Sequence, residues 1–515
     1  MENRKLLLSN ILVGGGTLLS RVTGFGRILA LAYAIGLGGL SDVYNTANTT
    51  PNIIYELMLG GILSATLLPS FVRSIKENDH RAISAVLSVT VILLAVLTII
   101  MVLAAPIVMQ VYSFTRQHSP AEFQNVGTSF VRLFMPQIFF YGLVSMATAL
   151  LNAQHKFALP AYTPILNNII VIMILLALPH VFGAGITLEM AAENSAIVTY
   201  LGWGTTAGIM ISALSLIPAM LRSGIKLEFL PDWAHPEVQK VLRLSGWTLG
   251  YVISNQIALY IVSLLALRED GWITAYQTAF AFFVLPHGLL AMTIITTFMP
   301  KIAHDAASAN IEGMTERMVQ GLKILMLLML PASAGYMLIA TPLLVSLLHH
   351  GAFTIDASHL TGGTLSMFAL GLFPFSAYLF LMRGYYALSD TKTPFKLNAV
   401  ENIMNIGLAV PLVSLMGVSG LALSYSLAYS ASFLLTFYAL NKRMGNRLMR
   451  FDLMIYGGKV LFATLVMCGA VALTLFELSG LTEWKKVIAA VIIGAVFYAG
   501  SVIMLKVVDL KLFRR

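Results

Sequence analysis

Long apolar runs, separated by short polar breaks, extend along almost the whole chain. A run of about 20 apolar residues is long enough to cross a bilayer as an α-helix. Fourteen such runs are present, so we expect an all-α integral membrane protein with about 14 transmembrane helices. The predicted spans are residues 8–36, 44–72, 82–114, 126–151, 160–182, 196–221, 242–267, 272–298, 320–349, 360–388, 395–416, 418–440, 457–477 and 485–506.

The composition agrees with this pattern. Hydrophobic residues make up 58% of the 515 residues and charged residues only 11%, whereas a soluble protein has about 25% charged residues. The first apolar run follows Met1–Lys5 in the manner of a signal peptide, but it is too long and carries Arg21. We therefore expect it to be retained as the first helix.

Lysines and arginines concentrate in alternate loops, on the same side of the membrane as the N-terminus. Arg73, Lys76, Arg222 and Lys442 are examples, whereas few cations, among them Arg116, lie in the outer loops. This bias places both termini in the cytoplasm and accounts for most of the net charge of +9. Because the cations are scattered over short loops, we expect contact with anionic membrane lipids and no nucleic-acid partner.

Two weak internal echoes divide the chain into halves. The run that starts at Pro136 resembles the run at Pro374, 238 residues later, and Pro69 matches Pro300 at an offset of 231. The pattern favours two six-helix lobes related by a pseudo-two-fold axis along the membrane normal, with the substrate site between them; chance similarity of apolar helices is the alternative. The expected divisions are 1–222 for the first lobe, 223–441 for the second, and 442–515 for two additional spans and a cytoplasmic tail.

The sequence carries no signature of enzyme chemistry. No loop is long enough for a soluble domain, and no HExxH, GxSxG, cysteine pair or P-loop is present. The histidines between residues 349 and 359 lack a spaced acidic partner, so no metal site is predicted. We expect a transporter with no catalytic residue and no cofactor.

Arg21 and Arg27 lie inside the first span, where a cation costs about 2.5–3.5 kcal/mol. Such residues point at something anionic, which is either an internal acid or a transported anion. We expect Arg27 to pair with Asp42 at the outer end of the first two spans, which leaves Arg21 as the freer ligand. The two arginines are about 240° apart on an ideal helix, and Gly24 and Gly26 offer a kink that turns both inward.

The second span begins with a polar stripe. Asn45, Asn48, Asn52 and Glu56 follow spacings of three and four residues, so they share one helical face, which Asp42 extends. A stripe of this kind is costly in lipid and is expected to face protein or water. Further polar insertions, which are more typical of helix–helix contacts, are Asn167, Asn168, Asn255, Gln256, Glu401, Asn402 and Asn405.

Several segments resemble the MurJ/MviN family of lipid II flippases, within the multidrug/oligosaccharidyl-lipid/polysaccharide exporter superfamily. The resemblance covers essentially the whole chain in order. The most specific pieces are the S-R-V-x-G-F-x-R motif, the P-N pair with a later proline, and the R-G-x-Y-A-L-x-D-T-K-T-P block. These stand in SRVTGFGRILALAYAIG (20–36), SDVYNTANTTPNIIYELMLGGILSATLLPSFV (41–72) and RGYYALSDTKTPFK (383–396).

The resemblance implies a flippase that moves lipid II, an undecaprenyl-pyrophosphate-linked peptidoglycan precursor, from the inner to the outer leaflet by alternating access. It implies that Arg21 and Arg27 hold the pyrophosphate, and that Asp42 is the acid that opens the second span. We add Asn48 and Asn52 as substrate-binding candidates. Lipid II, membrane lipids and cell-wall synthesis proteins are the expected partners. A flippase for another polyprenyl-linked glycan and a drug or cation antiporter of the same superfamily stay open.

The sequence departs from the family pattern at three places. Ile28 follows the second arginine where many members have Asp, Tyr55-Glu56 replaces an Arg-Arg pair, and Ala281 replaces an arginine. The site therefore has fewer cations than the family pattern. The driving force of some family members is linked to sodium or membrane potential. For this chain the sequence leaves the coupling ion open, with sodium and a proton as the candidates. The candidate coupling or cavity residues are Glu56, Asn255 and Glu401.

Overall fold

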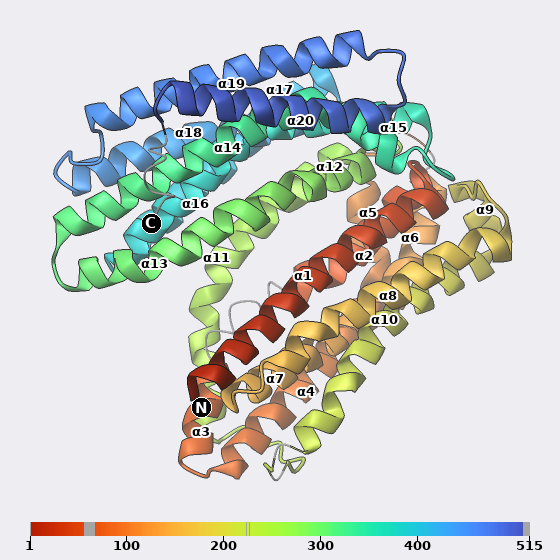
Figure 1. Cartoon of the computed structure of the whole chain (residues 1–515). Coiled ribbons are helices and arrows are strands. Elements are labelled where there is room, and N and C mark those ends of the chain that lie inside the picture. Colours follow the sequence, from red (N-terminus) through yellow and green to blue (C-terminus); the bar gives the residue numbers. More distant parts are fainter. Residues whose placement is uncertain are drawn as a thin grey trace. The chain divides into compact units, whose positions relative to one another are not determined.

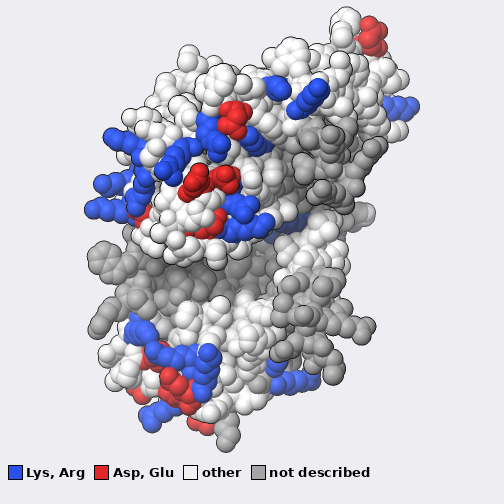
Figure 2. All heavy atoms as spheres, turned by 60° about the vertical axis from the view of Figure 1, so that its left-hand side comes forward, with Lys and Arg blue, Asp and Glu red and all other residues white. Residues whose placement is uncertain are grey.

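The computed structural model describes residues 2–55, 67–116, 118, 120–222, 224–225 and 227–507. The side chains of 2–11, 54–55, 120 and 243–255 lie outside this description. All regular elements in the described part are helices, which confirms the predicted all-α class. On the face drawn in Figure 2, charged side chains gather in clusters and broad areas carry none, as expected for a surface that contacts hydrocarbon.

The chain packs into two compact units, which are described separately. Unit 1 comprises Met1–Thr274 and His350–Phe353. Its helices are α1 (Glu2–Ile35), α2 (Gly39–Tyr55), α3 (Leu68–Lys76), α4 (His80–Leu103), α5 (Ala105–Ser113), α6 (Pro120–Phe134), α7 (Pro136–Ala153), α8 (Ala158–Phe182), α9 (Leu188–Glu193), α10 (Ser195–Leu221) and α11 (Pro236–Ala266).

Unit 2 comprises Ala275–His349 and Thr354–Arg515 and begins within the first turn of α12 (Trp272–Pro286). Its other helices are the π-helical η3 (His287–Ala291), α13 (Met292–Ala307), α14 (Ile311–Leu348), α15 (Ile355–Ala369), α16 (Leu372–Ala387), α17 (Lys392–Met416), α18 (Val418–Arg443), α19 (Phe451–Glu477) and α20 (Glu483–Met504). Packing units are not the same as lobes, so the predicted boundary at residue 222 stays a prediction.

Within unit 1, α1 packs along α8, and α8 packs along α10 (Figure 1). Helix α2 packs against α6 and α7, and it meets α1 in a small contact. The α1–α8 contact is close because Gly16 of α1 lies against Tyr162 and Gly24 against Asn168. The two helices that carry the predicted site are therefore held mainly by different neighbours.

Within unit 2, α19 and α20 pack on each other and along α14 (Figure 1). Ile339 of α14, Met467 and Val471 of α19 and Ala490 of α20 form a buried apolar cluster. The last two predicted spans are thus a helical pair attached to this unit.

The membrane spans agree with the apolar pattern in most places. Eleven helical stretches in the described part are long and apolar enough to cross a membrane, and α15 with α16, bent by 45°, makes a twelfth. The count of fourteen is not confirmed. The two other predicted spans, 44–72 and 242–267, include residues 56–66 or the side chains of 243–255, which lie outside the description.

The predicted break between the spans 395–416 and 418–440 is confirmed at Gly417. This residue has a φ of +60°, a value that a residue with a side chain adopts only under strain. Gly420 then lets the start of α18 lie against the carbonyl group of Leu412. Two glycines three residues apart therefore allow α17 and α18 to turn sharply and pack on each other.

Candidate functional site

Arg21 and Arg27 lie on α1, and neither has an acidic partner among the residues that the structure describes. Helix α1 is uninterrupted, and Gly24 and Gly26 do not break it. Arg21 is exposed and Arg27 is half-buried. No ion pair joins either arginine to an acid within the ranges that the structure describes. Among the described side chains, neither arginine therefore has an internal acid as its counter-charge.

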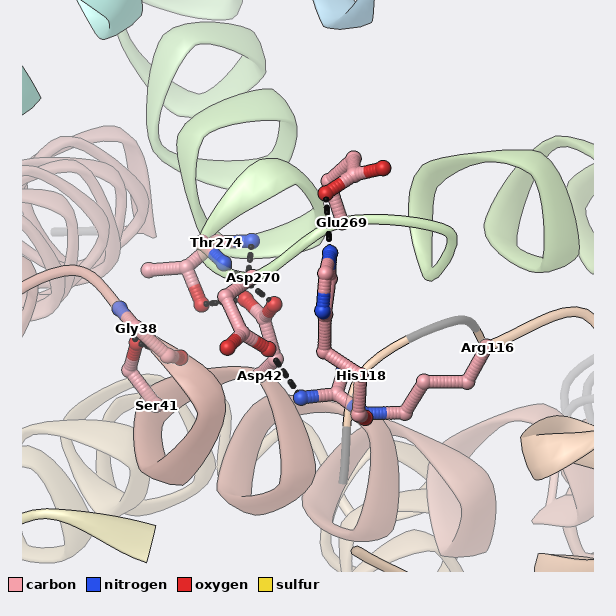
Figure 3. A network of polar contacts seen from close by, with 9 residues as sticks. Gly38, Ser41, Asp42, Arg116, His118, Glu269, Asp270 and Thr274 are labelled. Carbon is pink, nitrogen blue, oxygen red and sulfur yellow. Dashed lines mark hydrogen bonds and ion pairs between the residues drawn. The ribbon is translucent and has the colours of Figure 1, made fainter. Parts of the chain in front are cut away.

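The expected Arg27–Asp42 ion pair is wrong, because other groups occupy the Asp42 carboxylate. Asp42 is 0% exposed in the first turn of α2. Its Oδ2 accepts a hydrogen bond from the Gly271 N–H at 2.6 Å. Its Oδ1 accepts from the Thr274 N–H at 3.1 Å and from the Thr274 hydroxyl at 2.7 Å (Figure 3). The carboxylate thus fixes the turn between α11 and α12, which is 229 residues away in the chain.

The polar stripe on α2 divides into packing contacts and an exposed residue. Asn45 donates to the Thr274 hydroxyl at 3.0 Å, and the Asn48 side-chain oxygen accepts from Gln137 at 3.3 Å. Asn52 is exposed, whereas the predicted coupling candidate Glu56 lies outside the described residues. The shared face is therefore real for the described residues, but its outer part packs within unit 1.

A second group of charged residues lies beside Asp42 at the turn between α11 and α12. The Arg116 side chain is 0% exposed and forms an ion pair with Asp270 (Figure 3). Its Nε donates to the His118 carbonyl at 2.8 Å, and its guanidinium lies 4.1 Å from the centre of the Phe123 ring. The charge pattern predicts Arg116 as an outer-loop cation, and nothing in the local sequence indicates that its side chain is buried.

Other predicted polar insertions have local roles. Asn168 donates to the Ser20 carbonyl at 3.2 Å and to the Thr23 hydroxyl at 3.1 Å, so it is a helix–helix contact between α8 and α1. The side chain of Asn255 lies outside the description.

Glu401 is the buried acid of unit 2. It is 2% exposed in α17, and no ion pair to it occurs among the described residues. Helix α17 packs along α18, where the rings of Tyr425 and Tyr429 have centroids 4.6 Å apart. A carboxyl group buried without an ion pair is unfavourable as an anion, which makes it a candidate to bind a proton or a cation.

The R-G-x-Y-A-L-x-D-T-K-T-P block ends in a structured turn between α16 and α17. Asp390 accepts from the Thr393 N–H at 3.0 Å and from its hydroxyl at 2.7 Å, and it pairs with Arg443. The hydrogen bonds from Thr393, together with the Arg443 charge, hold the pKa of Asp390 below its usual value. This carboxylate therefore caps α17 and connects it to the end of α18.

Comparison with known proteins gives a consistent result. A family model described as "Lipid II flippase MurJ" matches residues 31–494, a range that begins after Arg21 and Arg27. A probable lipid II flippase MurJ from Vibrio cholerae is 26% identical over 94% of this chain and 91% of its own length. One from Haemophilus influenzae is 27% identical over 95% of this chain and 98% of its own length.

Solved structures show the same fold. A lipid II flippase MurJ in an inward closed conformation has a TM-score of 0.80, with 22% identity over 98% of this chain and 100% of that chain. An inward-facing multidrug transporter of the MATE family has a TM-score of 0.66, with 13% identity over 82% of this chain and 95% of that chain. These likenesses concern the fold alone.

Proposed function

We propose, from the premise that this chain belongs to the lipid II flippase MurJ family, that it moves lipid II from the inner to the outer leaflet and binds its pyrophosphate through Arg21 and Arg27. The observation that carries the site is that both arginines lie in a membrane helix without an acidic partner in the described structure. We further propose both termini in the cytoplasm, as the loop charges predict.

A pyrophosphate fits these arginines for chemical reasons. The guanidinium group keeps its charge at all physiological pH values and donates hydrogen bonds in a planar fork that matches phosphate oxygens. The half-buried position of Arg27 makes such a bond stronger than it is in bulk water. We also place two asparagines of α2 at the substrate. Asn52 is exposed and offers its side-chain amide to the polar groups of the substrate beside the pyrophosphate, and Asn48 is the second.

The negative charge of the pyrophosphate also favours one direction of transport. A membrane potential that is negative inside favours the export of an anion by about 2.3 kcal/mol per charge per 100 mV. Loading the cationic site with pyrophosphate neutralises it, and this change in charge is the step we associate with switching from inward to outward access.

Leaflet-resolved labelling of lipid II in cells depleted of the protein tests the function. We expect lipid II to accumulate in the inner leaflet, and the wild-type chain to restore export. An unchanged leaflet distribution of lipid II on depletion contradicts the proposal and points to another polyprenyl-linked glycan, or a drug, as substrate.

For the coupling ion we propose Glu401. Its burial in α17 without an ion pair among the described residues favours uptake of a proton or a sodium ion, which it can lose again. Asn405, one turn further along α17, is buried and accepts a hydrogen bond from Ser424 at 3.0 Å, so its side-chain oxygen is a second polar group on this helix.

Glu401→Gln should separate coupling from folding. The amide keeps the shape of the side chain and cannot carry the charge, so we expect normal membrane levels and loss of the response of transport to an imposed proton or sodium gradient. The measurement is lipid II flipping in proteoliposomes under each gradient, with the exposed Glu477→Gln as control. A Glu401→Gln protein that still responds to both gradients like the wild type contradicts the assignment.

A further inference from the structure

The outer turn between α11 and α12 is held from two sides. Asp42 accepts hydrogen bonds from Gly271 and Thr274, at its end near α12. Arg116 pairs with Asp270, in the middle of the same turn, and His118 lies 3.0 Å from the Glu269 carboxylate (Figure 3). Two segments far apart in the sequence therefore converge on residues 269–274.

This turn lies where the chain passes from unit 1 to unit 2. Unit 1 ends at Thr274, and unit 2 begins at the next residue. The other short segment that returns to unit 1, His350–Phe353, is also attached, because the Ala352 N–H donates to the Tyr33 carbonyl at 2.9 Å. The residues at which the chain leaves unit 1 are thus bound to the ends of α1 and α2.

The Arg116 side chain is bound strongly enough to position the turn, yet one nitrogen of its guanidinium lacks a hydrogen-bond partner among the described residues. Its Nε and Nη2 have partners, but its buried Nη1 has no hydrogen-bond partner within the described part of the chain. Its partner Asp270 is 48% exposed. A buried guanidinium with one unpaired nitrogen is stabilised less by its contacts than a fully bonded one. Breaking its contact with Asp270 therefore costs less free energy.

Thr115 adds a contact beside this pair. Its hydroxyl donates to the Leu264 carbonyl at 2.7 Å, in the last turn of α11. The segment that follows α5 therefore contacts both the end of α11 and the turn after it.

We infer that Arg116 is a positioning residue: through Asp270 it holds the 269–274 turn where Asp42 binds it, and this latch opens and closes in each transport cycle. The inference rests on the proposed function, because a cycle is required for the latch to matter. Arg116 does not contact the substrate. Its effect on transport is exerted through the turn, and the ligand-binding arginines of α1 are separate from it.

Cysteines at His118 and Glu269, in a Cys468→Ser background, test the latch. A short bismaleimide should crosslink this pair readily, and we expect the crosslinked protein to lose lipid II export while the untreated double-cysteine protein retains it. A second pair at Lys323 and Asp452, an ion pair of 2.8 Å within unit 2, is the matched control and should tolerate the crosslink. Normal export by the protein crosslinked at 118 and 269 overturns the latch.

A second readout does not depend on lipid II. Arg116→Ala should slow crosslinking of the 118/269 pair about tenfold or more, because the charge-assisted contact that holds the turn is gone. Arg116→Lys should recover part of the rate, and Arg132→Ala, at an exposed arginine of α6, should leave it unchanged. An unchanged rate in Arg116→Ala overturns the positioning role. The two readouts can also disagree. If neither the wild type nor any variant moves lipid II, but the crosslinking rates of the 118/269 pair change as expected, the proposed function fails and the latch stands.

Discussion

Arg21→Ala and Arg27→Ala are each expected to reduce lipid II export about tenfold or more without loss of the folded protein. Losing a charge-assisted hydrogen bond to phosphate costs about 1.5–3 kcal/mol, which is roughly a tenfold to hundredfold weaker site. Arg27 should give the larger loss, because it is half-buried whereas Arg21 is exposed. The measurement is rescue of lipid II export in depleted cells, with membrane levels of each variant quantified.

Folding should survive these substitutions, because no described acid is paired with either arginine and no carboxylate is left unpaired. Arg21→Lys and Arg27→Lys keep the charge without the planar fork, so partial export is expected of both. Arg132→Ala removes an exposed arginine from another helix of unit 1 and should export normally. Full export by a normally expressed Arg21→Ala and Arg27→Ala double variant would falsify the assignment of the pyrophosphate site.

Asp42→Ala should destabilise the protein and stop transport together. The substitution leaves three donors at Gly271 and Thr274 without their buried acceptor. An unsatisfied buried group costs about 1–3 kcal/mol, and partial access of water limits the total to roughly 2–5 kcal/mol. Thermal unfolding in detergent, measured beside export in cells, should show both losses.

Two variants separate the role of Asp42 from that of the arginines. Asp42→Asn keeps one acceptor oxygen, so an intermediate loss of stability is expected. Thr274→Val removes the hydroxyl donor while keeping the backbone N–H, and it should lower the unfolding temperature less than Asp42→Ala does. An Asp42→Ala protein that is as stable as the wild type but fails to bind lipid II argues instead that Asp42 contacts the substrate.

Local sequence was sufficient for the class of protein and for most of its helices. The hydropathy of a 20-residue stretch and the break at Gly417 depend only on residues that are close in sequence. Both can therefore be predicted without knowledge of the fold. The unusual position of Arg21 and Arg27 could be recognised for the same reason. A cation inside an apolar run is evident from the sequence, whichever helices pack around it.

Tertiary packing, by contrast, assigned the partners. The sequence favours a pair between Asp42 and Arg27, which lies 15 residues earlier in the chain, yet the carboxylate binds a turn 229 residues away. Arg116 looked like one more outer-loop cation, and its burial depends on Phe123 and Asp270 together. Hydropathy reports on the surroundings of a segment as a whole, whereas the partner of one polar atom depends on which distant segments meet. That information lies in the contacts between helices and not in their individual sequences.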